Sequence, residues 1–478
     1  MPLPFPLRQL IVPLACASGL AAWQADAEVH FPLRITPDGR HLEDATGRPF
    51  LVNGDAAWSL MVELDAAQTE LYLTNRRDLG IDTVLVNLIE RGFGGPANQD
   101  GELPFVPEDD YTSPNEAYFA YADQVLDRAA DLGMLVLLTP SYLGAACGSQ
   151  GWCEQMLAQS VEDMGEYGRF VGARYAHMDN IIWVHGGDSG SISARDHVNA
   201  IAEGIREMAP SHLHTGHCSR NNSAVECYDE PWLDINTTYS ACATSIDKVA
   251  DDYDHVPILP FFYIEGQYEG NTNDMVCLTG QNVWSVLGGA FGHVFGNNPI
   301  WRFGPGWEDE LLSPGSQAMD HLGRLFRSRA WVRFEPDQAG EVLVTGGGSE
   351  AVAARAADGE TAMVYLPESG PVSVDLGQVS GTHARIWWFD PVTGAAELHG
   401  TFPTSGVIQL ESPGLRVLVF DDDASNLPAP ASQPYDFPAR IPAIGPRWAV
   451  AAAALVGVTT LVAARRRTSR SSASAIAA

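Results

Sequence analysis

The sequence predicts an α/β fold: a (β/α)8 TIM barrel, followed by a small all-β sandwich domain and a C-terminal transmembrane helix. Three observations lead to this prediction. Short apolar runs alternate with amphipathic segments from residue 50 to about residue 335. From about residue 340 the helical patterns stop, and short alternating segments with glycine-rich turns follow. Near the end of the chain, an apolar stretch at residues 448–464 is directly followed by three arginines.

Eight apolar runs predict the strands of the barrel, because continuous hydrophobicity over a few residues is typical of strands buried on both faces. They span residues 49–55, 83–89, 134–142, 180–188, 212–218, 232–240, 258–265 and 293–303. The segments between them are amphipathic and several end in glycine, as helices often do. In the stretch "SPNEAYF", Ser113 predicts a helix cap and Pro114 a first turn. An open doubly wound sheet is the alternative, but no G-x-G-x-x-G follows the first run.

The pattern divides the chain into six segments. We expect a signal peptide at 1–27, the barrel domain at 28–337, the β-sandwich at 338–424, a Pro/Ala-rich linker at 425–446, a transmembrane or sorting segment at 447–467 and a cytoplasmic tail at 468–478. The signal peptide is predicted by an apolar run after Arg8 and by an Ala-Asp-Ala cleavage site before Glu28. Cys16 leaves a lipoprotein signal open as an alternative.

The C-terminal segment predicts attachment to the cell envelope. Residues 448–464 approach the length of a membrane span, and the arginines that follow place the tail on the cytoplasmic side. A buried core helix is the alternative. Ile441, Pro442, Trp448 and the arginines resemble the IPTL-type sorting signals of bacterial exported proteins. The resemblance implies either a retained anchor, with the folded domains outside the cytoplasm, or release to the extracellular space after a sorting protease removes the tail.

The acidic charge balance limits the partners of the folded part. The 478 residues carry 60 Asp and Glu against 28 Lys and Arg, a formal net charge of −32. Such a protein disfavours nucleic acid and anionic lipid as ligands, because both are negatively charged. A membrane is therefore expected as a partner only through the C-terminal segment.

Six cysteines remain after removal of the signal peptide, and an even number in an exported chain favours disulfides. Short loops suggest the pairs Cys147–Cys153 and Cys218–Cys227, which leaves Cys242–Cys277 by elimination. Six cysteines allow fifteen connectivities, so the pairing stays open at this point. A zinc site has less support, because no C-x2-C pair occurs.

Acidic side chains stand at the predicted carboxyl ends of the strands, where the active sites of such barrels lie. Asp188 ends the fourth apolar run and Glu265 ends the seventh. These strands lie across the barrel mouth from each other, so their carboxyls are suited to flank a glycosidic bond. Glu269 is the alternative to Glu265. The structural alternatives are a cap or turn role for Asp188 and an ion pair for Glu265.

The other residues at these strand ends are suited to bind sugars, since carboxylates and amides bond to hydroxyls and aromatic rings stack on sugar faces. The expected contacts are Asp55, Trp58, Asn87, Tyr142, His185, Tyr239 and Trp301. The two glycines before Asp188, Gly186 and Gly187, would let the backbone turn sharply and leave room for a sugar.

The run "SHLHTGHC" places His212, His214 and His217 close together. In a strand, His212 and His214 share a face, as metal ligands can. Alternatively, one or two of the histidines line the pocket and the rest are structural. We expect no metal and no other cofactor, and a metal-dependent hydrolase stays an alternative.

Five stretches of the barrel region carry a family resemblance. They read "NGDAAWSL", "PNEAYFAYADQVLDRAADLG", "YGRFVGARYAHMDNIIWVHGGD", "YIEGQYEG" and "GGAFGHVFGNNPIWRF". Together they resemble the apiosidase-like glycoside hydrolases over residues 45–335. The resemblance implies a retaining (β/α)8 enzyme in which Asp188 is the acid/base and Glu265 the nucleophile. The characterised activity of that family is release of apiose from a pectin side chain.

One departure from the family concerns the pocket. The family commonly has Gln-Ser-Gly-His after strand six, where this chain has Tyr239-Ser240-Ala241-Cys242. The segment after the barrel is similar to the small β-domain that usually follows, which has been named for collagen binding. We expect this domain to cover a face of the barrel rather than to bind glycan.

The sequence therefore predicts an exported, envelope-anchored glycoside hydrolase. We expect it to cleave a side chain of a plant or algal polysaccharide by double displacement between two carboxylates. The alternatives are a non-catalytic carbohydrate-binding or adhesion protein and a metal-dependent hydrolase.

Overall fold

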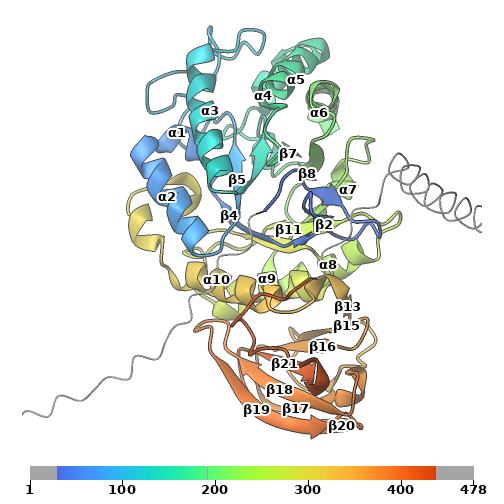
Figure 1. The fold of residues 1–478 in the computed structure, drawn as a ribbon. Helices are drawn as coiled ribbons and strands as arrows, with labels where there is room; N and C mark the ends of the chain where they lie inside the picture. Colours follow the sequence, from blue (N-terminus) through green and yellow to red (C-terminus); the bar gives the residue numbers. More distant parts are fainter. Residues whose placement is uncertain (1–28, 191, 438–478) are drawn as a thin grey trace, which may run out of the picture.

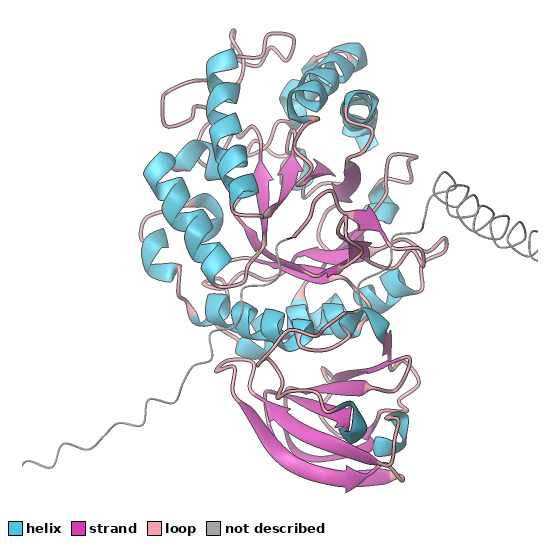
Figure 2. Cartoon of the chain, viewed as in Figure 1, coloured by secondary structure: helices cyan, strands magenta, loops and turns pink. Residues whose placement is uncertain are grey.

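The computed structural model describes residues 29–190 and 192–437. The predicted signal peptide, transmembrane segment and cytoplasmic tail lie outside these ranges. Figure 1 shows a barrel ringed by helices, with a β-domain packed against one side of it. Figure 2 shows that strands dominate this second domain. Within the described ranges, none of the helices combines the length and the apolar character that a membrane crossing requires.

Eight parallel strands of the described residues form the barrel, which confirms the predicted (β/α)8 barrel. They are β4 (Val52–Ala56), β5 (Thr83–Asn87), β6 (Leu135–Thr139), β7 (Ile181–Gly186), β8 (Leu213–His217), β10 (Asn236–Tyr239), β11 (Phe261–Glu265) and β12 (Gly292–Phe295). β12 pairs with β4, and a bridge between Thr215 and Ile235 joins β8 to the start of β10, so the ring closes. Short β9 (Asn222–Ser223) pairs antiparallel with β10.

Helices surround the barrel and connect its strands. They are α1 (Leu60–Glu63), α2 (Ala66–Asp78), α3 (Glu116–Asp131), α4 (Cys153–Ala158), α5 (Val161–Tyr175), α6 (Arg195–Met208), α7 (Ala224–Cys227), α8 (Ser245–Tyr253), α9 (Met275–Leu287) and α10 (Pro314–Arg327). A small antiparallel sheet precedes them, formed by β1 (Arg34–Ile35), β2 (Leu42–Glu43) and β3 (Pro49–Phe50).

The start of α3 corrects the predicted cap. The N-cap is Asn115, whose side chain accepts a hydrogen bond from Ala117 N–H at 3.2 Å. Ser113 instead donates its hydroxyl to Asp110 in the preceding turn at 3.2 Å. The helix therefore begins two residues later than the Ser-Pro pair suggests, because an Asn was available closer to the apolar face.

The β-domain begins at residue 334 and consists of two facing sheets. A six-stranded sheet has the order β13-β15-β16-β21-β18-β19, and a three-stranded sheet has the order β14-β17-β20. The strands are β13 (Phe334–Pro336), β14 (Leu343–Thr345), β15 (Val352–Ala356), β16 (Thr361–Leu366), β17 (Ser369–Asp375), β18 (His383–Phe389), β19 (Ala396–Pro403), β20 (Val407–Pro413) and β21 (Arg416–Asp422). Val372, Leu418 and Phe420 belong to the core of this domain. The predicted all-β domain is therefore confirmed.

The barrel and the β-domain share one continuous apolar core. Figure 1 shows α9 and α10 between the barrel strands and the β-domain. Trp284 and Leu287 of α9 belong to the same buried cluster as Met363, Tyr365 and Val419 of the β-domain. The β-domain thus covers a helical face of the barrel.

The first part of the predicted linker also packs against the barrel. Tyr435 N–H donates to the Arg327 carbonyl at 2.7 Å, just at the end of α10. Ala431 N–H donates to the Ser328 hydroxyl at 3.0 Å. This segment is therefore anchored to the barrel as far as the structure describes it.

Candidate active site

A pocket of about 270 Å³ opens at the carboxyl ends of the barrel strands. Its lining residues are Trp58, Phe93, Tyr142, Ala145, Gln150, Asp188, Arg220, Tyr239, Glu265, Gly266, Tyr268, Asn271 and Trp301. The structure thus brings the two predicted catalytic acids into one pocket. Four of the seven predicted sugar contacts, Trp58, Tyr142, Tyr239 and Trp301, also line it.

Glu265 ends β11, and its carboxylate is held by two neighbouring donors. Its side chain is 14% exposed, and Oε2 lies 2.7 Å from Nε2 of His217. The hydroxyl of Tyr268 also hydrogen bonds to Glu265. Tyr268 in turn accepts a hydrogen bond from Trp58 Nε1 at 3.0 Å. These contacts fix the direction in which the carboxylate faces the pocket.

His217 connects the two acids, and its contacts define its tautomer. The backbone N–H of Asp188 donates to Nδ1 of His217 at 2.6 Å. Because Nδ1 is an acceptor, the ring hydrogen lies on Nε2, which donates to Glu265. A neutral imidazole therefore satisfies both contacts, and one side chain sets the spacing between the backbone at Asp188 and the carboxylate of Glu265.

Asp188 follows β7 in an unusual backbone conformation. Gly186, Gly187 and Asp188 have successive φ values of +86°, +116° and +40°. A Cβ on Gly187 would lie 2.1 Å from the Tyr142 ring, and one on Gly186 would lie 2.2 Å from the Tyr228 hydroxyl. The glycines thus give the predicted sharp turn, but the room that they leave is filled by tyrosines. A left-handed Asp188 carries strain of a kind that is common at functional sites.

The surroundings of Asp188 favour its protonated form. Burial raises the pKa of the Asp188 carboxyl to about 6, and the charge of Glu265 acts in the same direction. A positive charge on His217 would oppose this shift, and the charge and the backbone N–H of Arg220 oppose it as well. A carboxylic acid with a pKa near 6 can give and take a proton close to neutral pH, as a general acid/base must.

Arg220 and Tyr268 are pocket residues that the sequence analysis missed. The Arg220 guanidinium lies 5.5 Å from the centre of the Tyr239 ring. Arg220 lies between Cys218 and Cys227, in the loop after a histidine-rich strand, and this position could have indicated a pocket residue. Tyr268 stands three residues after Glu265 in the same motif, so a contact between the two could have been considered.

All three predicted disulfides form, and each lies at the mouth of the barrel. Cys147–Cys153 closes the loop after β6, and Cys218–Cys227 closes the loop after β8. Cys242–Cys277 joins the loop after β10 to α9. Every one of these loops contributes residues to the pocket or adjoins a strand that does.

The three other predicted sugar contacts do not line this pocket. Asp55 is fully buried and pairs with Arg76 Nε at 2.6 Å, on the side of the barrel covered by α2. His185 Nε2 lies 2.8 Å from His214 Nδ1 in the interior. Asn87 ends β5 and is 1% exposed. Side chains alternate in direction along a strand, so a residue near the carboxyl end can face away from the mouth.

Glu269, the alternative catalytic acid, also lies outside the pocket. Its carboxylate accepts hydrogen bonds from the Ser313 hydroxyl, from Gly315 N–H at 2.9 Å and from Asn297 Nδ2 at 3.0 Å. Ser313 and Gly315 stand at the start of α10, where a carboxylate stabilises the helix N-terminus. The position of Glu269 therefore indicates a structural acid.

The three histidines in and just before β8 have separate partners. His212 Nδ1 accepts a hydrogen bond from Trp183 Nε1 at 3.0 Å. His214 contacts His185, and His217 contacts Glu265. Among the described residues, no three His, Cys, Asp or Glu side chains are grouped as metal ligands would be.

Comparisons with known proteins agree with this architecture. Residues 36–333 match the family model "Apiosidase-like, catalytic domain", and residues 336–421 match "Putative collagen-binding domain of a collagenase". A solved glycoside hydrolase family 5 structure from Bacteroides vulgatus ATCC 8482 is 23% identical, with a TM-score of 0.73 over 83% of this chain and 96% of that one. A structure described as a glycoside hydrolase is also 23% identical, with a TM-score of 0.72 over 83% and 99%. A comparison with curated proteins found no match. At these identities the solved structures establish a shared fold.

Proposed function

The chain belongs to the apiosidase-like family, and on that premise we propose that it is a retaining glycoside hydrolase that removes a side-chain sugar from a plant or algal polysaccharide outside the cytoplasm. The observation that carries this proposal is the meeting of Asp188 and Glu265 in one pocket, coupled through His217. A protonated acid beside an oriented carboxylate is the pair that two-carboxylate glycoside hydrolysis requires.

In the first step, the Glu265 carboxylate attacks the anomeric carbon. Asp188 donates its proton to the oxygen of the leaving group as the glycosidic bond breaks. In the second step, Asp188 takes a proton from water, the water oxygen attacks the same carbon, and the bond to Glu265 breaks. Because the pKa of Asp188 is raised to about 6, the same side chain can serve as acid first and as base afterwards.

The aromatic residues of the pocket suit a sugar ring. Trp58, Tyr142 and Trp301 provide ring faces and edges at the walls. The pocket volume of about 270 Å³ lies at the small end of ligand sites. Its size favours one terminal sugar over a long stretch of polymer, which supports removal of a side chain.

One segment beside the pocket departs from the family pattern and bears on which sugar is bound. The segment Tyr239-Ser240-Ala241-Cys242 replaces the family's usual Gln-Ser-Gly-His, and Tyr239 lines the pocket. The proposal of an envelope location rests on the predicted signal peptide and C-terminal segment alone.

Product analysis on a panel of plant and algal polysaccharides tests the activity. We expect release of a monosaccharide whose initial anomer, followed by proton NMR, has the configuration of the substrate. The opposite anomer would overturn the retaining mechanism. Binding of glycans without cleavage would favour a carbohydrate-binding protein, and loss of activity in EDTA would favour a metal-dependent hydrolase.

Two substitutions test the roles of the acids. Asp188→Asn should lower kcat on the natural substrate by about 10²–10⁴-fold, and by less on an aryl glycoside whose leaving group needs no proton. Glu265→Gln should abolish turnover of both, because it removes the nucleophile. Glu269→Gln is the matched control: it should lower thermal stability and leave kcat unchanged. Near-wild-type turnover of both Asp188→Asn and Glu265→Gln would refute the assignment.

A further inference from the structure

Helix α9 lies between the β-domain and the part of the barrel that carries Glu265. Figure 1 shows it at the junction of the two domains. Every residue from Cys277 to Leu287 is buried. Since a buried helix packed on two sides has little freedom to shift, contacts on its opposite faces are mechanically linked.

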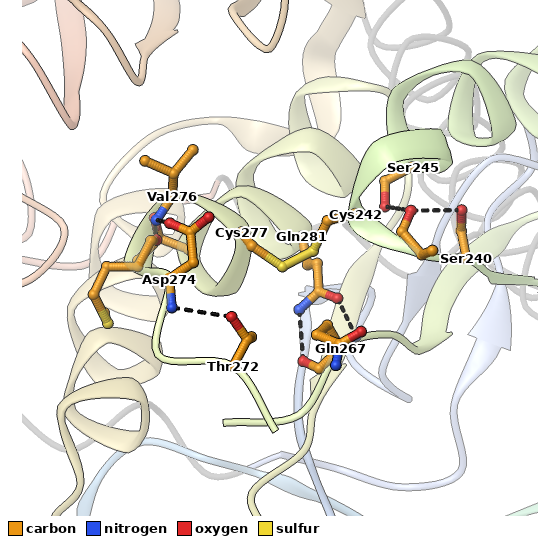
Figure 3. Close-up of a disulfide and its surroundings, with 12 residues drawn as sticks. Ser240, Cys242, Ser245, Gln267, Thr272, Asp274, Val276, Cys277 and Gln281 are labelled. Atoms are coloured by element: carbon orange, nitrogen blue, oxygen red, sulfur yellow. Dashed lines mark hydrogen bonds between the residues drawn. A yellow bond between two sulfur atoms is a disulfide. The ribbon is translucent and has the colours of Figure 1, made fainter. Parts of the chain in front are cut away.

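On the barrel side, Gln281 of α9 holds the segment that follows the nucleophile. Its Oε1 accepts a hydrogen bond from Gln267 N–H, and its Nε2 donates to the Gln267 carbonyl at 3.1 Å. Figure 3 shows this pair of hydrogen bonds. Gln267 lies between Glu265 and Tyr268, the hydroxyl donor to Glu265. One buried amide thus fixes the backbone that joins the nucleophile to its hydrogen-bonding partner.

Gly266 shows how closely the amide fits. A Cβ on this glycine would lie 2.1 Å from Gln281 Oε1 and 2.8 Å from the Tyr263 ring. Any side chain at residue 266 would therefore displace the amide or the loop. The residue directly after the nucleophile is thus shaped to admit Gln281.

Cys277 stands one turn before Gln281 on the same face of α9. Its disulfide to Cys242 joins Cα atoms 5.7 Å apart, and Figure 3 shows it beside Gln281. Cys242 follows Tyr239 by three residues, and the Tyr239 ring packs at 5.1 Å from the ring of His217. One helical turn therefore holds both the loop of Glu265 and the loop of Tyr239.

The β-domain holds the same turn from the other side. The Tyr365 hydroxyl of β16 donates to the Val276 carbonyl at 3.0 Å and lies 3.1 Å from the Thr279 hydroxyl. Further along α9, Trp284 Nε1 donates to the Glu350 carbonyl at 2.9 Å. Val276 and Thr279 flank Cys277 in the sequence, so the β-domain is bonded to the part of α9 that carries the disulfide.

We propose that Gln281 and the Cys242–Cys277 disulfide form a clamp that positions the nucleophile, and that the β-domain sets this clamp through Tyr365. The β-domain then contributes to turnover without touching substrate, and opening of the disulfide slows the reaction. Gln281 and Tyr365 are positioning residues, since they act through the main chain on either side. The proposal rests on the proposed function for its kinetic consequences, whereas its structural consequences can be measured without a substrate.

Gln281→Met tests the barrel side of the clamp, because methionine keeps the volume and removes both hydrogen bonds. We expect kcat to fall by roughly 10–100-fold, since displacement of a reacting group by about 1 Å has effects of this order, while KM changes little. Hydrogen exchange of residues 265–271 should become faster. Gln159→Met is the matched control, because Gln159 also donates its amide to a main-chain carbonyl, that of Asp109, at 3.1 Å but does not line the pocket.

Tyr365→Phe tests the β-domain side and removes a single hydroxyl. We expect a smaller fall in kcat, roughly 3–10-fold, with faster exchange of residues 265–271. Tyr435→Phe is its control, because the Tyr435 hydroxyl donates to Glu360 at 2.8 Å and accepts from Arg333, neither of which belongs to α9. Replacement of both Cys242 and Cys277 by Ala should resemble Gln281→Met.

The pH profile separates a positioning role from a merely structural one. The charge of Glu265 helps to raise the pKa of Asp188, so a displaced Glu265 should move the basic limb of kcat/KM to lower pH in Gln281→Met. The proposal is overturned if these variants lower the melting temperature but leave kcat, the pH profile and the exchange of residues 265–271 at the values of their controls. If Gln281→Met does not fold, Tyr365→Phe decides by the same readouts. A wild-type protein that cleaves no glycoside, but whose exchange responds as expected, would keep the clamp and refute the proposed function.

Discussion

The pocket at the barrel mouth and the junction with the β-domain both contain buried ionisable side chains. At the junction a carboxylate is paired with an arginine, whereas in the pocket two carboxyl groups lie together. At the junction, Arg329 and Asp421 are 0% and 3% exposed and form two hydrogen bonds of 2.8 and 2.7 Å. The Thr361 hydroxyl adds a third hydrogen bond to the same carboxylate at 2.8 Å. At the mouth, Asp188 shares a pocket with a second carboxylate, Glu265, and burial raises its pKa to about 6.

This difference separates charges that serve stability from a charge that serves chemistry. A buried ion pair with all its hydrogen bonds is costly to break, because either partner alone would be a charge without compensation. A reacting acid needs a pKa close to the working pH, which requires an environment that does not stabilise its charge. Neutral replacements in the two regions should therefore have opposite effects on stability and on activity.

The largest expected effect on stability belongs to the junction. Arg329→Met leaves Asp421 buried without its cation, so we expect the free energy of unfolding to fall by about 3–5 kcal/mol. Denaturant unfolding measures this loss, and kcat per folded molecule should stay near the wild-type value. Arg128→Met is the control, because its ion pair with Glu70 is exposed to solvent and should contribute far less to the free energy of unfolding. Equal effects of the two variants would contradict the comparison.

The barrel strands could be predicted from the sequence because each is buried on both faces and therefore appears as a continuous apolar run. The run 180–188 contains β7, and the run 258–265 contains β11. The residues at which the strands end could not be predicted in the same way, because apolar residues continue into the loops. Trp301, placed in the last predicted strand, lies instead in a short 3-10 helix (Ile300–Arg302) at the pocket.

The site could be predicted only in part, because strand ends identify residues but not the direction of their side chains. Asp188 and Glu265 follow strands across the barrel and both reach the pocket. Asp55 has the same kind of position, yet its side chain points to Arg76 on α2. The role of His217 depends on the left-handed backbone at Asp188, whose φ is +40°, and no local pattern signals such a contact between two strands.

The next largest expected effect on stability concerns Asp188 at the barrel mouth. The folded pKa of Asp188 is raised to about 6, whereas an unfolded Asp titrates near 3.9. The folded carboxyl thus holds its proton more tightly, so Asp188 costs stability increasingly as pH rises from about 4 to about 6. Asp188→Asn should raise the free energy of unfolding at pH 7.5 by on the order of 1–2 kcal/mol, allowing for partial exposure.

Thermal unfolding at two pH values checks this sign. At pH 3.5 both carboxyl and amide are neutral, so Asp188→Asn should have little effect on stability there. Asparagine tolerates the left-handed backbone, so the substitution should add no strain. Asp421→Asn is the contrasting variant, expected to destabilise the protein at pH 7.5. A gain in stability of Asp188→Asn that is the same at both pH values would show that the charge of Asp188 is not its cause.

The smallest expected effect is a shift of the pH profile by Arg220. Asp188 must be protonated to act as the acid, so kcat/KM should be high below pH 6 and fall as pH rises through the pKa of about 6. The Arg220 charge lowers this pKa. Arg220→Gln keeps the backbone N–H and removes the charge, so it should move the basic limb upward by less than about one pH unit.

The control is Arg195→Gln, because the Arg195 guanidinium pairs with Glu230 at 2.9 Å outside the pocket. This variant should leave the basic limb in place. A downward shift in Arg220→Gln would mean that the guanidinium acts on the acid by holding Tyr239 and its neighbours in position rather than by its charge, since loss of a nearby cation can only raise the pKa of a carboxyl.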